Sequence, residues 1–148
     1  MRVVLQVVKE ASVTINNELY SSINDGFLLL VGFTQGDNVD IIKKVIDKIV
    51  SLRIFMDENG KTNLAFDPSK QEILCVSQFT LYADISHGRR PSFTTCLRPD
   101  EARVLYQETL NYLESLNIKT KAGVFGEDMK VNLLNDGPFT LMIDSEDL

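Results

Sequence analysis

Phe27-Leu28-Leu29-Leu30-Val31 is the stretch that decides the fold, because five consecutive apolar residues leave no face of a strand polar. An apolar run of this length, bounded by turn signals, is typical of a strand that is covered on both faces. Asn24-Asp25-Gly26 supplies a turn signal directly before it. The pattern therefore predicts a central strand with protein packed on either side.

A β-hairpin is predicted before this strand. Residues 11–15 alternate in polarity, Asn16-Asn17 is a two-residue turn signal, and residues 18–23 are typical of a returning strand. Short turns between neighbouring strands indicate a largely antiparallel sheet. Further strands are predicted over residues 72–82, 124–126, 129–134 and 139–143, with a turn at Asn135-Asp136-Gly137 before the last of them.

Two principal helices complete the prediction. The second helix begins at Pro99, a residue that suits a first helical turn, and continues to about Leu116. No repeat or linker divides the chain, so residues 1–148 are predicted to form a single α+β domain. The first helix covers about residues 39–52 and places one apolar face on the core, formed by Val39, Ile42, Ile46, Ile49 and Val50.

The charge balance limits the partners that this chain can have. Fifteen Lys and Arg residues stand against twenty-one Asp and Glu residues, which gives a net charge of -6. Proteins that cover a nucleic acid backbone normally carry the opposite sign, because Lys and Arg make the phosphate contacts. We therefore expect no DNA partner and only a local contact with RNA.

The cysteines and the absence of cofactor motifs indicate a plain cytoplasmic protein. Cys75 and Cys96 form no CxxC pair, which favours a reducing compartment. The longest apolar stretch, residues 27–33, is far shorter than the roughly twenty residues that span a bilayer. Neither a nucleotide-binding loop nor a metal-binding motif is present. We expect no cofactor, no metal and no membrane partner.

Ser77-Gln78-Phe79-Thr80 is the first segment that can carry chemistry. It places hydrogen-bonding groups directly after the apolar residues 73–76, at a strand end where polar groups line an edge or a pocket. Its main-chain N–H groups are candidate donors, because successive side chains of a strand point to opposite faces. The alternative is a strand that becomes polar where it reaches the surface.

Gly137-Pro138 is the second such segment. A proline directly after an Asp-Gly turn removes a donor at the point where strand pairing resumes. One interpretation is an ordinary turn at a sheet edge. The other is a cis peptide bond, which occurs in about 5–6% of X-Pro bonds and presents two neighbouring carbonyl oxygens on one side of the chain.

A basic segment lies between His87 and Arg98 in an otherwise acidic chain. Its arginines, Arg89, Arg90 and Arg98, suit the binding of phosphate groups, and a solvated loop is the alternative. His87 is the only histidine. A Ser/His esterase would therefore depend on it as the general base.

Two separated motifs together resemble the signature of a known family. Val76-Ser77-Gln78-Phe79-Thr80-Leu81, combined with Asn135-Asp136-Gly137-Pro138 and Thr140, is similar to the paired motifs of the D-aminoacyl-tRNA deacylases, also called D-tyrosyl-tRNA deacylases. The likeness extends over nearly the whole chain. It implies a barrel-like α+β fold with mainly antiparallel β sheets, a homodimer, and hydrolysis of the ester that joins a D-amino acid to the terminal adenosine of tRNA.

The resemblance also implies roles for particular residues. Gly137-Pro138 would be cis and would enter the partner subunit's pocket, where it excludes L side chains and lets glycine pass, so that glycyl-tRNA(Ala) is a second substrate. Ser77, Gln78 and Phe79 would line the pocket, with backbone N–H groups that bind the ester carbonyl as it becomes an oxyanion. Thr80 is a candidate nucleophile, and the alternative is that the 2′-hydroxyl of the tRNA activates water.

Two other functions remain open from the sequence. One is a related proofreading deacylase with an altered preference for chirality or tRNA, and the other is the Ser/His esterase that uses His87. The family usually has Arg where this chain has Val7, a residue associated with support of the Gly-Pro segment. The family also usually has Val where this chain has Phe139, a position at the implied dimer contact. Neither difference falls on the paired motifs.

Overall fold

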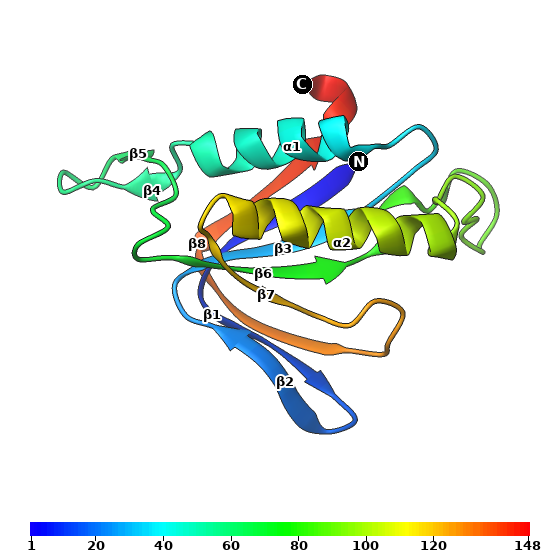
Figure 1. Ribbon diagram of the computed structural model, residues 1–148, viewed down its shortest axis with the longest axis horizontal. Coiled ribbons are helices and arrows are strands. Elements are labelled where there is room, and N and C mark those ends of the chain that lie inside the picture. The colour runs from blue at the N-terminus through cyan, green and yellow to red at the C-terminus, as the bar shows by residue number, and fades with distance from the viewer.

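The computed structural model describes all 148 residues, in eight strands, two α-helices and two short 3₁₀-helices (Figure 1). In chain order these elements are β1 (Arg2–Ile15), β2 (Glu18–Ile23), β3 (Gly26–Gly32), α1 (Val39–Ser51), β4 (Phe55–Met56), β5 (Thr62–Leu64), β6 (Glu72–Ser77), η1 (Phe79–Tyr82), α2 (Pro99–Ser115), β7 (Lys119–Ala122), β8 (Lys130–Asp144) and η2 (Ser145–Asp147). The predicted α+β class with two principal helices is confirmed.

Strand β1 organises the main sheet, because it pairs antiparallel with β2, β3 and β8. On the far side of β3, strands β6 and β7 continue the sheet in parallel. The Ser21 hydroxyl of β2 donates to the Ala122 carbonyl of β7 at 2.8 Å, so the two ends of the strand order approach each other. The result is the nearly closed, barrel-like sheet that was expected, with mainly antiparallel pairs.

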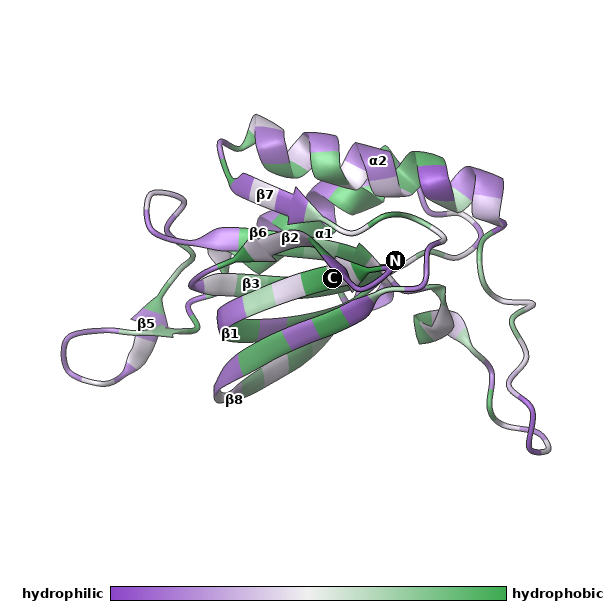
Figure 2. Cartoon of the chain, turned by 90° about the horizontal axis from the view of Figure 1, so that it is seen from below, coloured by the Kyte–Doolittle hydropathy of each residue, from purple (hydrophilic) through white to green (hydrophobic).

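The predicted central strand is confirmed. In β3 every residue except Leu30 is buried, with Phe27 and Leu29 fully inaccessible to solvent. Helices α1 and α2 pack beside each other on one side of the sheet (Figure 1). Figure 2 shows β8 on the side of the sheet away from α2, with apolar and polar residues alternating along it.

Helix α1 follows its predicted span closely. The Asn38 side chain caps it by accepting hydrogen bonds from the backbone N–H groups of Asp40 and Ile41. Val39 lies at the first position and is exposed, so its predicted burial is wrong; Val45 takes its place in the core. Neither α-helix has the length and apolar character needed to cross a membrane.

Two predicted strands differ from the structure. The strand expected over residues 72–82 ends at Ser77, because the chain turns there into the 3₁₀-helix η1. Residues 124–126 form a loop, and the strand lies earlier, at β7. The sequence of β7 shows no apolar pattern that would predict a strand, and Lys119 and Lys121 are exposed in it. The strand is defined by its backbone pairing with β6.

The predicted turn at residues 135–137 is also wrong, because β8 does not reverse direction there. Both of its halves pair with β1, with Gln6 opposite Thr140 and Val8 opposite Asn135. Only Val7 lies between these partners on β1, whereas residues 136–139 lie between them on β8. The four residues 136–139 therefore form a bulge in one long strand, and this segment is called the β8 bulge below.

Candidate active site

A cavity of about 720 Å³ lies beside the end of β6 and the start of α2. Its walls come from the β6–η1 junction, the loop before α2 and the segment after β7. More than half of its seventeen lining residues are hydrophobic, as expected for a small-molecule site with a few polar groups. The lining includes Ser77, Gln78, Phe79, Phe93, Phe125 and Gly126.

Ser77, Gln78 and Phe79, three of the candidate residues from the sequence, line this cavity. The Gln78 N–H donates to the Val31 carbonyl at 2.7 Å, which ties the end of β6 to β3. Phe79 then begins η1, and the first N–H groups of a helix have no acceptor within the helix. Thr80 does not line the cavity; its hydroxyl accepts a hydrogen bond from the Gln78 side chain.

An aromatic pair forms one rim of the cavity. The rings of Phe79 and Phe93 lie 5.1 Å apart in an edge-on arrangement and are 53% and 45% exposed. Aromatic rings held in this way offer a surface on which a nucleobase can stack. Phe93 was missed as a site residue, although the chain around it carries part of the family resemblance, because a lone aromatic residue in a loop has no spacing signal.

The two cysteines and the tyrosine that support the cavity do not supply a base. Burial raises the pKa of the Cys75 thiol to about 12 and also raises the pKa of Cys96, so both cysteines stay protonated near neutral pH. Cys96 donates to the Phe79 carbonyl at 3.3 Å, and burial raises the pKa of Tyr106, whose hydroxyl donates to the Cys75 carbonyl at 2.8 Å. These groups support the wall of the cavity.

The β8 bulge carries Gly137-Pro138 in the cis form, and both residues are exposed. Asn135 braces the bulge from inside: its side-chain oxygen accepts from the Phe139 N–H at 2.7 Å, and its amide donates to the Thr140 hydroxyl at 3.0 Å. Neither Gly137 nor Pro138 lines the cavity of its own chain. The Gly137-Pro138 part of the bulge is therefore exposed on the surface of the chain.

The predicted basic residues divide into two groups. Arg89 and Arg90 are exposed and lie outside the cavity lining. Arg98 does line the cavity, but its guanidinium lies 3.4 Å from a carboxylate oxygen of Asp100 and 3.8 Å from one of Glu101. Part of the charge of Arg98 is therefore balanced within the chain.

His87 does not reach the cavity. Its Nδ1 atom lies 2.7 Å from the Ser86 hydroxyl, and both residues are exposed on the loop that precedes α2. No carboxylate orients the imidazole ring, and Ser77 lies in the cavity that His87 does not line. The structure thus does not assemble the triad that the esterase interpretation requires.

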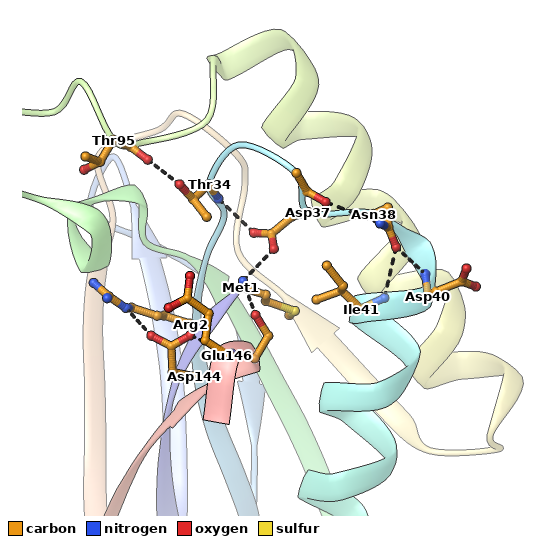
Figure 3. Close-up of polar contacts among 12 residues, drawn as sticks. Met1, Arg2, Thr34, Asp37, Asn38, Asp40, Ile41, Thr95, Asp144 and Glu146 are labelled. Atoms are coloured by element: carbon orange, nitrogen blue, oxygen red, sulfur yellow. Dashed lines mark hydrogen bonds and ion pairs between the residues drawn. The ribbon is translucent and has the colours of Figure 1, made fainter. Parts of the chain in front are cut away.

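A polar cluster at the start of β1 anchors the loop that carries Phe93 (Figure 3). The Met1 ammonium group lies 2.6 Å from an Asp37 carboxylate oxygen, and Asp37 also accepts from the Thr34 N–H at 2.8 Å. The Thr34 hydroxyl donates to the Thr95 carbonyl at 2.6 Å. Nowhere in the chain do three or more His, Cys, Asp or Glu residues gather as a potential metal site.

Comparison with known proteins agrees with this fold. Residues 4–144 match the family described as D-Tyr-tRNA(Tyr) deacylase. A D-aminoacyl-tRNA deacylase of Lactobacillus gasseri is 50% identical over 97% of this chain and 99% of its own, and one of Thermosipho africanus is 47% identical over 99% and 98%. A solved structure described as c-Myc DNA Unwinding Element Binding Protein superimposes with a TM-score of 0.91 at 35% identity, covering 97% of this chain and 98% of that one.

A hydrolase of carboxylic esters is the class of protein that the fold, the cavity and these relatives define together. The chain belongs to the D-Tyr-tRNA(Tyr) deacylase family, because the family model covers nearly all of it and relatives near 50% identity match it end to end.

Proposed function

We propose that this protein hydrolyses the ester between a D-amino acid and the terminal adenosine of tRNA, and that it also releases glycine mischarged onto tRNA(Ala). The observation that carries the proposal is the cavity in which Ser77, Gln78 and Phe79 meet beside an aromatic rim. A neutral nucleoside with a small attached acyl group fits such a mixed apolar and polar site. Its family membership points to the same substrate class.

The proposed mechanism relies on positioning and on backbone dipoles. The adenine ring stacks on Phe79 and Phe93, which brings the ester to the β6–η1 junction. Water adds to the ester carbonyl carbon, the first N–H groups of η1 stabilise the negative oxygen, and the bond to the 3′-oxygen then breaks with protonation of that oxygen. We assign activation of the water to the tRNA 2′-hydroxyl, because His87 does not line the cavity and the two carboxylates that do, Glu127 and Asp128, come from the segment after β7 and not from the β6–η1 junction. Thr80 acts through its hydrogen bond with Gln78.

Homodimerisation is part of this proposal. Gly137 and Pro138 are exposed and do not line the active-site cavity of their own chain, so a second copy is the natural recipient of the β8 bulge. On the same strand Leu134 is 55% exposed and Met142 is 63% exposed. A long edge strand with exposed apolar residues is an expected pairing surface. The carbonyl oxygens of Gly137 and Pro138 would then occupy the space that an L side chain needs.

The cytoplasm is the proposed location, because aminoacyl-tRNA is the proposed substrate. Cys75 and Cys96 are free thiols, which fits a reducing compartment.

Contact with the tRNA backbone is proposed for Arg89, Arg90 and Arg98. Removing all three should raise KM and reduce its salt dependence, because each phosphate contact releases counterions.

One assay tests the proposed activity directly. Purified protein is incubated with D-tyrosyl-, L-tyrosyl- and glycyl-tRNA(Ala), and release of each amino acid is measured. We expect hydrolysis of the first and third substrates and little of the second. Equal hydrolysis of the D and L substrates would contradict the exclusion mechanism, and no hydrolysis of any would contradict the activity.

The His87→Ala variant separates the deacylase from the esterase alternative. Because His87 lies outside the cavity, the variant should keep its activity within about twofold. A loss of 10²–10⁴-fold, which is typical of removing a general base, would favour the esterase instead.

A further inference from the structure

Arg103 stands beside the cavity with a guanidinium that is not neutralised within the chain. It lies in α2, and its guanidinium carbon is 4.8 Å from the centre of the Phe125 ring. A terminal nitrogen of Arg103 also approaches Gly126, since it would lie 3.8 Å from a Cβ atom at that position. Phe125 and Gly126 both line the cavity, whereas Arg103 does not, so Arg103 lies next to this part of the cavity rim.

The guanidinium of Arg103 is held in place by packing. The Phe125 ring lies 5.9 Å from the Tyr106 ring, and the Tyr106 hydroxyl is bonded to the Cys75 carbonyl in β6. A cation stacked on an aromatic ring keeps its N–H groups free at the edge of the guanidinium plane. Arg103 is therefore a preorganised donor, because its position is coupled through two rings to the central sheet.

The charges around Arg103 distinguish it from the other arginines. Arg103 forms none of the ion pairs of the chain, whereas Arg98 pairs with Asp100 and Glu101. Two acidic residues, Glu127 and Asp128, follow Gly126 in the cavity lining, and Lys130 lies 2.8 Å from the Asp128 carboxylate. A phosphate that approaches this wall therefore meets acidic groups, and Arg103 is a cation beside Phe125 and Gly126 that no carboxylate pairs.

We propose that Arg103 binds a backbone phosphate of the tRNA acceptor end next to the terminal adenosine. This inference rests on the proposed function, because the adenosine must occupy the cavity for the RNA strand to leave across its rim. Arginine donates to phosphate through two parallel N–H groups, which makes the contact directional as well as electrostatic. Arg103 thus adds a binding contact outside the Ser77–Thr80 segment and the predicted basic loop.

The test compares Arg103→Gln with the matched variant Arg98→Gln on two substrates. D-tyrosyl-tRNA contains the phosphate, and D-tyrosyl-adenosine has the same ester without any phosphate. For Arg103→Gln we expect KM to rise about tenfold on D-tyrosyl-tRNA, with kcat within twofold, and no change on D-tyrosyl-adenosine. Arg98→Gln should raise KM less, because the Arg98 guanidinium already pairs with Asp100 and Glu101. Arg103→Lys should restore part of the affinity.

Salt dependence and uncharged tRNA complete the experiment. The slope of log affinity against log salt should fall by roughly one in Arg103→Gln, as expected for one lost phosphate contact. An unchanged KM on D-tyrosyl-tRNA, or an equal change on both substrates, would overturn the proposal and assign Arg103 a packing role. If wild-type protein hydrolyses neither substrate, the proposed function fails; an unchanged dissociation constant for uncharged tRNA in Arg103→Gln overturns the Arg103 proposal separately.

Discussion

Strands β3 and β8 both pair with β1 at Arg2–Gln6 and Val8, yet β3 is buried and β8 is largely exposed. Six of the seven residues of β3 are buried, whereas only Ile143 is buried among the fifteen of β8. The difference arises because β3 has β6 as a second neighbour and the helices above it, while β8 is the edge of the sheet. Strand β3 thus forms part of the buried core, and β8 forms part of the exposed surface.

Only the edge strand can carry the presented Gly-Pro segment. A bulge of four residues would disrupt pairing on both sides of an internal strand, but on β8 the outer side has no partner within the chain. Strand β3 therefore supplies stability, and β8 supplies a surface that one chain leaves open. The variants below test this division, beginning with the largest expected effect.

Leu29→Ala in β3 and Leu134→Ala in β8 make the same chemical change on the two partners of β1. Leu29 is fully buried, so its truncation should reduce the free energy of unfolding by about 2–5 kcal/mol. Leu134 is more than half exposed, so its truncation should change the stability of one chain by only about 0.5 kcal/mol. Urea titrations at several protein concentrations measure both effects.

Protein concentration distinguishes folding from association in these titrations. If β8 is a dimer surface, Leu134→Ala should weaken the dependence of the unfolding midpoint on concentration, because association stabilises the folded state by mass action. Equal losses of unfolding free energy in Leu29→Ala and Leu134→Ala would contradict the proposal that β3 stabilises the chain more than β8 does.

Gly137→Ala tests the β8 bulge itself. Gly137 has a φ of +144°, and a Cβ atom there would lie 2.7 Å from the Phe139 nitrogen, so the bulge must shift. A shift of about 1 Å in a positioning element should reduce the ratio of kcat/KM for D- over L-tyrosyl-tRNA by roughly 10²-fold. The matched control is Gly60→Ala, where φ is also positive but space is open. An unchanged ratio of kcat/KM would show that the β8 bulge does not determine the D-over-L selectivity.

Glu72→Gln tests the β3–β6 side through its pH dependence. The Glu72 carboxylate is largely buried, pairs with Lys119, and accepts from the Asn24 N–H at 2.7 Å. Burial acts to raise the pKa of Glu72, but the Lys119 and Asn24 contacts outweigh it and lower the pKa below its ordinary value of 4.5. The charged form therefore adds stability that is fully present above pH 4.5 and is lost as the pH falls through the lowered pKa.

The measurement is the thermal midpoint of wild type and Glu72→Gln between pH 3 and pH 8. At pH 7 the variant should be less stable by roughly 1–3 kcal/mol, because a hydrogen-bonded carboxylate is lost. The difference should narrow below pH 4.5. Glu58→Gln, on an exposed turn, is the control that should follow the wild type throughout. A difference that stays constant to pH 3 would contradict the assigned role of the charge.

Lys9→Ala should have the smallest effect. The Lys9 ammonium lies 3.4 Å from an Asp25 oxygen and 3.5 Å from an Asp136 oxygen, so it links the turn before β3 to the β8 bulge. Because these groups are about half exposed, the pair should contribute no more than about 1 kcal/mol. We expect a modest fall in D-over-L selectivity that vanishes at high salt. Lys70→Ala, which removes an exposed ion pair that does not include a residue of the bulge, should show no such fall.

Local patterns in the sequence were sufficient for much of the fold and part of the site. The apolar run at residues 27–31, the Asn16-Asn17 turn and the capped helix α1 follow from burial, turn propensity and side-chain capping within a few residues. Ser77, Gln78 and Phe79 were placed at a strand end for the same reason, and the structure brings them into one cavity. These features depend on interactions between residues that are close in the chain.

Only the tertiary structure decided the features that depend on distant neighbours. Strand β7 exists through backbone bonds to β6, and β8 continues past Gly137 because β1 is long enough to pair with both halves. The roles of Phe93 and Arg103 likewise depend on which rings and carboxylates surround them in space. Hydrophobic periodicity records which face of a segment is buried, but it carries no record of the partner strand, the opposing ring or the missing counter-charge.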